Sequence, residues 1–136
     1  MKSMPPSQPS GAHVDVLIID DDELWGLGLL DRLKDSPWRA AFHQGPFGTV
    51  NAIRAARPRV LILDLNMPGL EGTRILELVR KRNELSHTKV LLLSSTQQNE
   101  LDRIAVENGF DASLHKSASK ADLIATVTAL MGRTVQ

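Results

Sequence analysis

Acidic side chains follow two apolar runs in this 136-residue chain. Four consecutive acids, residues 20–23, come directly after the run 14–19, and Asp64 follows the run 60–63. Carboxylates that gather in a folded protein repel one another and raise one another's pKa, so the folded state needs a cation among them. The chain has no cysteine, and no histidine lies in either acidic stretch. Ligands made only of oxygen favour a hard ion, and we expect Mg²⁺.

A carboxylate beside a metal ion and a lysine can attack phosphorus and form an aspartyl phosphate. One of the clustered carboxylates would be that nucleophile. Lys116 follows the stretch 112–115, and Ser94 follows the run 90–93. A metal ion and a lysine would neutralise charge on phosphoryl oxygens, and a serine hydroxyl would donate a hydrogen bond to one of them.

The apolar runs are the elements that must position these residues. Runs 14–19, 60–63 and 90–93 lack polar alternation, which predicts strands buried on both faces of a parallel sheet. Segments 38–43 and 112–115 are weaker strand candidates, expected nearer the sheet edges. Ligands of such sheets bind at the carboxyl ends of the strands, so the residues that follow the runs should gather on one rim.

Helical spacing of apolar residues fills the gaps between the runs. The expected stripes are Leu24, Leu27, Leu30 and Leu33; Val50, Ile53 and Ala56; Ile75, Leu78 and Val79; Leu101, Ile104 and Ala105; and Leu123, Ile124, Val127 and Leu130. Asn108-Gly109 is a helix stop, and Ser119 with Asp122 resembles a capping box. Strict alternation of five strands and five helices predicts an α/β fold with helices on both faces of the sheet.

Length and composition limit the remaining possibilities. We expect residues 1–13, rich in Pro and Ser, to form a flexible tail, and residues 14–133 to form one domain. The 16 basic and 16 acidic residues give a net charge of zero, which argues against nucleic-acid binding by this domain. No apolar run is long enough to span a membrane and no secretory signal is present, so a cytoplasmic location is expected.

Each candidate residue also has a purely structural interpretation. Asp22 lies where an acid caps the following helix, and Asp64 can open a turn before Pro68. Taken alone, Lys116 fits a surface lysine and Ser94 fits a turn. The joint pattern is far less expected by chance than any one of these residues.

Over residues 14–131 the chain resembles the receiver domain of two-component response regulators. The motifs that carry the resemblance are VLIIDDDE (16–23), VLILDLNMPGLEG (60–72), VLLLSS (90–95) and LHKSAS (114–119). The D-x-N-M-P-G-x-x-G segment within the second motif is the most specific. The resemblance implies a doubly wound (βα)5 fold, flavodoxin-like or CheY-like, with strand order 2-1-3-4-5.

The resemblance also implies a role for each residue of the rim. Asp64 would be the phosphoacceptor, Ser94 the switch hydroxyl and Lys116 the partner of a phosphoryl oxygen. The implied Mg²⁺ site consists of Asp21 as a direct ligand, Asp20 acting through water, Asp64, and the backbone carbonyl of Asn66.

Family membership would further imply the partners. The phosphoryl donor would be a histidine kinase or a phosphotransfer protein. The phosphorylated domain would act on a downstream protein through its fourth helix, fifth strand and fifth helix. Family members often dimerise through the face from the fourth helix to the fifth helix, so a homodimer is a further expected partner. Such a domain is a signalling module rather than an enzyme, although it assists its own phosphorylation and dephosphorylation. No direct binding of nucleic acid or membrane is expected.

Two positions depart from the family pattern. Ser113 stands three residues before Lys116, where receivers usually carry an aromatic switch residue, and Ser117 stands where proline is common. The usual aromatic lever is therefore absent, and we expect the loop after the fourth strand to carry the response instead. Trp25, one helical turn past Asp21, either lines the mouth of the pocket or is partly exposed.

Three alternatives stay open. The altered Ser113 position is compatible with a receiver-like interaction module that works without phosphorylation. An aspartyl-phosphate hydrolase needs a second acid two residues after its nucleophile; Asp20 and Asp22 have that spacing, whereas Asp64 is followed by Leu65 and Asn66. A flavin-binding protein is disfavoured because the acidic run would repel a phosphate.

Overall fold

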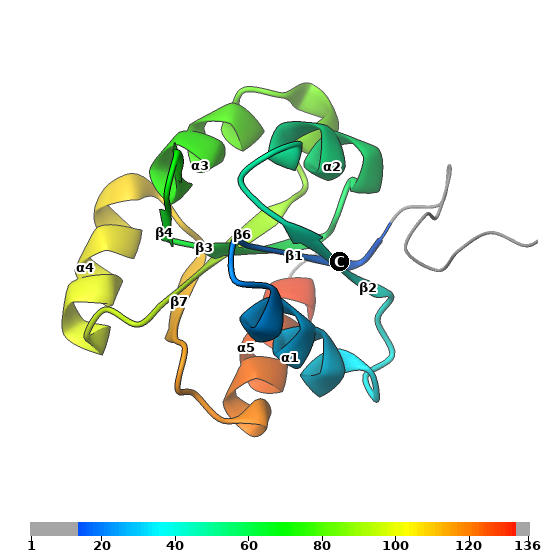
Figure 1. The fold of residues 1–136 in the computed structure, drawn as a ribbon, viewed down its shortest axis with the longest axis vertical. Helices are drawn as coiled ribbons and strands as arrows, with labels where there is room; N and C mark the ends of the chain where they lie inside the picture. The colour runs from blue at the N-terminus through cyan, green and yellow to red at the C-terminus, as the bar shows by residue number, and fades with distance from the viewer. Residues whose placement is uncertain (1–13, 133–136) are drawn as a thin grey trace, which may run out of the picture.

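Residues 14–132 are described by a computed structural model (Figure 1). The elements, in chain order, are β1 (Val16–Asp20), α1 (Glu23–Leu33), β2 (Ala40–Gln44), α2 (Thr49–Ala56), β3 (Val60–Asp64), β4 (Asn66–Met67), β5 (Leu70–Glu71), α3 (Gly72–Arg80), a 3-10 turn (Asn83–Leu85), β6 (Lys89–Ser94), α4 (Gln98–Asn108), β7 (Ala112–His115) and α5 (Lys120–Gly132). The tail expected at residues 1–13 lies outside the described residues.

The five long strands form one parallel sheet in the order β2-β1-β3-β6-β7. This order is the predicted 2-1-3-4-5, because β4 and β5 pair only with each other in a small antiparallel hairpin. The two weaker strand candidates are the edge strands β2 and β7, as expected. The hairpin was not predicted; its turn contains Gly69, whose φ of +87° favours glycine.

Side chains of the central strands alternate between two separate cores. In β1, Val16 and Ile18 pack with α1 and α5, whereas Leu17 and Ile19 pack with α2, α3 and α4. Figure 1 shows the same division, with α1 and α5 below the sheet and the other helices above it or at its side. Burial on both faces is the physical reason for the uninterrupted apolar runs.

The predicted apolar stripe of the first helix is wrong in part. Leu24 is 83% exposed and Leu27 is 46% exposed, whereas Gly26, Leu29 and Leu33 are buried. Gly26 faces the ring of Phe42 so closely that an added Cβ would lie 2.0 Å from that ring. Because α1 approaches β2 closely, the face of α1 that contains Gly26 is the one that is buried. A prediction based on the spacing of leucines cannot detect this.

The helix ends agree with the predicted signals. Ser119 Oγ accepts a hydrogen bond from the backbone N–H of Asp122 at 3.0 Å, at the start of α5. Gly109 ends α4 with a φ of +86°. None of the helices in residues 14–132 is long and apolar enough to cross a membrane.

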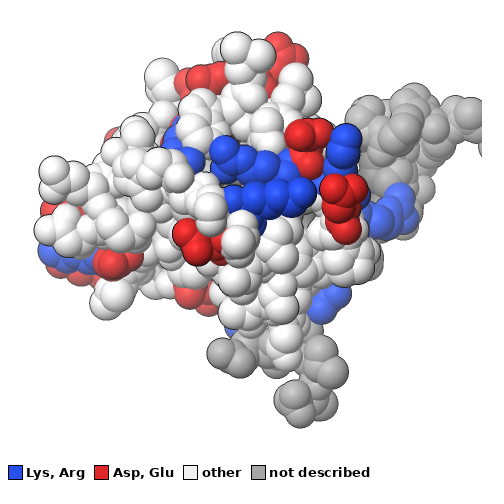
Figure 2. Space-filling view, turned by 90° about the horizontal axis from the view of Figure 1, so that it is seen from below, with Lys and Arg blue, Asp and Glu red and all other residues white. Residues whose placement is uncertain are grey.

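Charge on the surface is mixed. On the face seen from below in Figure 1, a short row of basic side chains is bordered by acidic ones (Figure 2). Ion pairs join opposite charges near the end of α1, where Lys34 Nζ lies 3.4 Å from Asp31, and between α5 and the segment after α1, where Lys120 Nζ lies 3.7 Å from Asp35. This face offers no broad basic patch, in keeping with the zero net charge.

Candidate functional site

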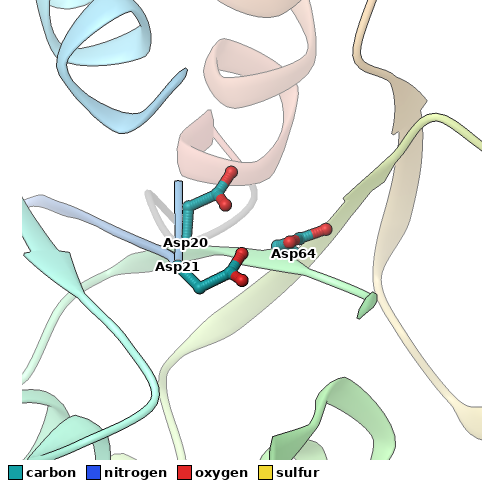
Figure 3. Close-up of side chains that lie close together, drawn as sticks. All are labelled: Asp20, Asp21 and Asp64. Atoms are coloured by element: carbon teal, nitrogen blue, oxygen red, sulfur yellow. The ribbon is translucent and has the colours of Figure 1, made fainter. Parts of the chain in front are cut away.

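Three aspartates meet at the carboxyl ends of β1 and β3. Asp20 ends β1 and Asp21 follows it, while Asp64 ends the neighbouring strand β3. Each offers a carboxylate oxygen, and these oxygens lie within 4.8 Å of one another (Figure 3). The parallel register of adjacent strands brings together residues more than 40 positions apart.

Lys116 supplies the positive charge nearest to this cluster. Its Nζ lies 3.0 Å from Asp20 Oδ2 and 3.8 Å from Asp64 Oδ1, and its side chain is 13% exposed. The backbone N–H of Lys116 donates to the carbonyl of Ser94 at 2.8 Å, directly after β7. The main chain of the lysine is thus fixed to β6, and its side chain reaches across the ends of the strands to the acids.

Asp64 is a buried acid with a perturbed pKa. It is only 5% exposed. Burial, reinforced by the neighbouring Asp20 carboxylate, raises the pKa of Asp64 from 3.8 to about 6, although Lys116 and the backbone N–H of Asn66 favour the charged form. Asp64 is therefore mostly ionised at neutral pH, but it is held there against an unfavourable environment.

The donor set fits a divalent cation. Asp20 Oδ1 accepts the backbone N–H of Asp22 at 3.0 Å. Oδ2 of Asp20 is buried and accepts no hydrogen bond within residues 14–132, although Lys116 lies close enough for an ion pair. Three carboxylates with a single lysine leave an excess of negative charge, and oxygen ligands of this kind suit Mg²⁺.

Ser94 and Asn66 complete the rim beside Asp64. Ser94 is fully buried; its hydroxyl donates to Thr96 Oγ1 at 3.0 Å and accepts the backbone N–H of Thr96 at 3.1 Å. The Asn66 side-chain amide lies 3.5 Å from Ser94 Oγ, and its backbone N–H lies 3.3 Å from Asp64 Oδ1. The Ser94 hydroxyl is thus hydrogen-bonded to Thr96, two residues further along the chain. In the parallel register Asp64 pairs with Leu93, the residue directly before Ser94.

Asp22 takes the structural role rather than a place in the site. Its side chain accepts the backbone N–H of Trp25 at 3.2 Å as the N-cap of α1. Because one Asp22 oxygen is used for the cap and the residue is exposed, the pairing of Asp20 with Asp22 that a hydrolase would need is not supported.

A polar network occupies the place of the aromatic switch. Ser113 Oγ donates to Asp102 Oδ1 at 2.7 Å, and the Gln98 amide donates to the same oxygen at 2.7 Å. Gln98 Oε1 in turn accepts the backbone N–H of His115 at 3.1 Å. These bonds lower the pKa of Asp102, with Ser113 as the largest cause. Sequence reasoning noted the missing aromatic but found no sign of its polar replacement.

The loop after Lys116 is held without a proline. Within residues 14–132 the cis peptide bond is Gly45–Pro46, so the Lys116–Ser117 bond is trans. The His115 ring bridges two segments, with Nε2 3.1 Å from the carbonyl of Ser95 and Nδ1 3.0 Å from the backbone N–H of Ser117. Trp25 is half-buried on α1, with the centre of its ring 5.1 Å from Lys116 Nζ. Both positions expected for this tryptophan hold in part, because the side chain is partly exposed on α1 and its ring also lies beside the lysine of the site.

Comparison with known proteins agrees with this fold and this arrangement. The family model for the response regulator receiver domain matches residues 16–128. The chain therefore belongs to the receiver domains of two-component response regulators. The α/β sheet and the acidic rim are the features that define this class.

Individual relatives are distant. The chain is 30% identical over 125 residues to the probable transcriptional regulatory protein TcrX of Mycobacterium tuberculosis, covering 91% of this chain and 52% of TcrX. It spans about half the length of such curated relatives.

Solved structures are similar over nearly their whole length. The receiver domain of the putative response regulator NarL from Mycobacterium tuberculosis has a TM-score of 0.74 and 27% identity, covering 90% of this chain and 99% of that one. Chemotaxis response regulator CheY4 of Vibrio cholerae has a TM-score of 0.76 and 22% identity, covering 87% of this chain and 98% of that one. At that identity CheY4 supports the fold alone.

Proposed function

We propose that this protein accepts a phosphoryl group on Asp64 in a Mg²⁺-dependent reaction and relays the signal through its α4–β7–α5 surface. The observation that carries the proposal is the cluster of Asp20, Asp21 and Asp64 with Lys116 paired to two of its members. Such a set of charges stabilises a phosphoryl group in transfer and has no purely structural need to be buried.

In the proposed reaction a carboxylate oxygen of Asp64 attacks phosphorus. A bond forms between that oxygen and phosphorus as the bond from phosphorus to the donor breaks, and the donor leaves as a neutral imidazole or, with acetyl phosphate, as acetate. Asp20, Asp21, Asp64 and the Asn66 carbonyl would hold Mg²⁺, which supplies neutralising charge to the phosphoryl oxygens.

Lys116 would neutralise a second phosphoryl oxygen, since its ammonium already lies 3.8 Å from Asp64. Ser94 would exchange its bond to Thr96 for a bond to the phosphoryl group, because an aspartyl phosphate adds charge and acceptor oxygens. That movement would pull the 94–97 loop and with it the start of α4, biasing two arrangements of the surface.

The partners follow from the family and from the chemistry. We propose a histidine kinase or a phosphotransfer protein as the donor, and a protein target for the α4–β7–α5 surface. A cytoplasmic location agrees with both partners.

The test is phosphorylation of the intact protein by acetyl phosphate with Mg²⁺, read by mass. We expect a gain of one phosphoryl group that disappears in Asp64→Asn and in EDTA. A gain that persists in Asp64→Asn would refute the assignment of the acceptor.

The second candidate is an interaction module that works without phosphorylation, favoured by the polar network at Ser113. The absence of any adduct, together with no response to beryllofluoride, would favour this module. The beryllofluoride arm is needed because rapid hydrolysis also removes an adduct.

A further inference from the structure

Trp25 contacts the lysine of the site, and the proposed reaction gives it no role. The residue lies in the first turn of α1, where its backbone N–H is bound by the Asp22 cap. The centre of its ring is 5.1 Å from Lys116 Nζ. This distance is within the range at which an ammonium is attracted to the face of an indole, and tryptophan is the strongest aromatic partner for a cation.

The same face of α1 reaches the loop beyond Lys116 at a second point. Arg32 lies seven residues after Trp25, which places both on one side of the helix. Its guanidinium lies 5.7 Å from the Trp25 ring, and its Nη1 is 3.4 Å from the carbonyl of Ala118. The indole therefore lies beside two cations, Lys116 and Arg32. Arg32 also contacts the loop that follows Lys116.

The main chain around Lys116 is already fixed from the opposite side. Its N–H is bonded to Ser94, and the His115 ring ties Ser95 to Ser117. What these bonds leave free is the four-carbon stem of the lysine, which loses rotamer entropy whenever its ammonium is held. The ammonium at the end of that stem is held by Asp20 and Asp64, and the Trp25 ring lies beside it as a third neighbour.

We propose that Trp25 is a positioning residue that holds the Lys116 ammonium between Asp20 and Asp64. An aromatic face attracts the charge without accepting a conventional hydrogen bond, so the N–H groups of Lys116 stay available to the acids and to an incoming phosphoryl oxygen. The ring acts through Lys116 and does not touch the phosphoryl group. The effect on rate rests on the proposed function, whereas the contact between Trp25 and Lys116 does not.

The first experiment compares initial rates of Asp64 phosphorylation by acetyl phosphate with Mg²⁺. We expect Trp25→Leu to lower the rate about threefold to tenfold, the size of a partly desolvated cation–π contact. Trp25→Phe keeps an aromatic face and should recover most of the rate. Trp38→Leu is the matched control, because Trp38, in the segment after α1, is a tryptophan partly buried against the same core as Trp25, and its loss should leave the rate unchanged.

Two outcomes would overturn the positioning role. One is a Trp25→Leu rate equal to that of the wild type. The other is an equal loss in Trp25→Leu and Trp25→Phe, because a role in packing alone gives phenylalanine no advantage from its quadrupole. If Trp25→Leu fails to fold, Trp25→Met takes its place in the same comparison.

The second experiment needs no phosphorylation. Urea unfolding in EDTA is measured for Trp25→Leu, for Lys116→Met and for the double variant. We expect the two effects to be less than additive, because each substitution removes the same contact. Strict additivity would refute the contact. If the wild type takes no phosphoryl group, the proposed function fails, and this cycle still decides whether Trp25 holds Lys116.

Discussion

Asp64 is held in the folded protein at an energetic disadvantage. Its pKa of about 6 exceeds that of an aspartate in the unfolded chain, near 3.8. The folded state therefore binds this proton more tightly than the unfolded state does. The stabilisation from protonated Asp64 is complete below about pH 4 and is lost as the pH rises through about 6.

The first prediction is that Asp64→Asn stabilises the protein at pH 7.5 in EDTA. The pKa difference corresponds to at most about 3 kcal/mol of unfolding free energy, and asparagine has no charge to bury. The gain should shrink toward zero near pH 4, where Asp64 is itself neutral. Urea unfolding at several pH values measures both; a variant no more stable than the wild type at pH 7.5 would contradict the strain at Asp64.

The second prediction is that Mg²⁺ stabilises the folded protein, because the ion would offset the repulsion among the buried carboxylates. With free ion at ten times its dissociation constant, binding to the folded state alone adds about 1.4 kcal/mol. We expect this increment in the wild type and its loss in Asp20→Asn, because the buried carboxylate of Asp20, which Lys116 pairs through Oδ2, is part of the donor set. Thermal unfolding in buffer without other divalent ions, with and without Mg²⁺, measures this gain in stability. An equal rise of the unfolding temperature in the wild type and in Asp20→Asn would argue against this site.

At the scale of elements, α1 shows how packing selects one face of a helix. Its leucines at residues 24 and 27 are exposed, and its close contact with β2 runs through Gly26. The exposed leucines lie on a helix that begins directly beside the acids. The face that α1 turns to the sheet is therefore set by Gly26, which has no side chain, and not by the row of leucines that is the most apolar.

The third prediction contrasts the two glycines of α1. Gly26→Ala should destabilise the protein by about 1–3 kcal/mol, because its Cβ would meet the Phe42 ring and force both elements to shift. Gly28→Ala has open space around its new Cβ and should stabilise the helix by about 0.5–1 kcal/mol. Chemical denaturation of the pair tests the packing, and a Gly26→Ala protein as stable as Gly28→Ala would disprove it.

The polar link between α4 and β7 gives the fourth prediction. Ser113→Ala should raise the pKa of Asp102 toward its ordinary value, because the Ser113 hydroxyl is the largest cause of its lowering. Carbon-detected titration of the Asp102 carboxyl measures the change. An Asp102 titration that is unchanged in Ser113→Ala would contradict this link between α4 and β7.

For the whole molecule, the question is how a charge at the rim reaches a surface. In the proposed switch the connection would run from Ser94 through the 94–97 loop to α4, and from α4 through the hydrogen bonds of Gln98 and Asp102 to β7. An aromatic lever is absent from this path. A network of hydrogen bonds between two elements can provide two discrete arrangements, which is what a switch requires.

The last prediction is that a beryllofluoride complex changes hydrogen exchange in residues 97–106 more than in α2. The α2 helix lies on the sheet away from this path and provides the comparison within one sample. Unchanged exchange in residues 97–106, with the complex formed, would exclude the loop after β6 as the carrier of the signal.

Most of the fold could be predicted because local patterns and burial agree. Uninterrupted runs such as Val60–Leu63 are buried on both faces, and alternation with helices leaves few possible arrangements. The hairpin at Asn66–Glu71 was missed because two-residue strands carry no periodicity. The exposed leucines of α1 were misjudged because spacing shows which residues share a face but not which face is covered.

The sequence by itself determined which residues end each strand, and parallel pairing then requires Asp20, Asp64, Ser94 and Lys116 to share one edge of the sheet. Their types already indicated an oxygen-ligand site and a phosphoryl acceptor. Only the tertiary structure decided which neighbours act on them: Trp25 on Lys116, Asp102 on Ser113 and His115 on the loop. The reason is physical, because strand order is set by patterns along the chain, whereas contacts between side chains depend on distances between elements that no local pattern records.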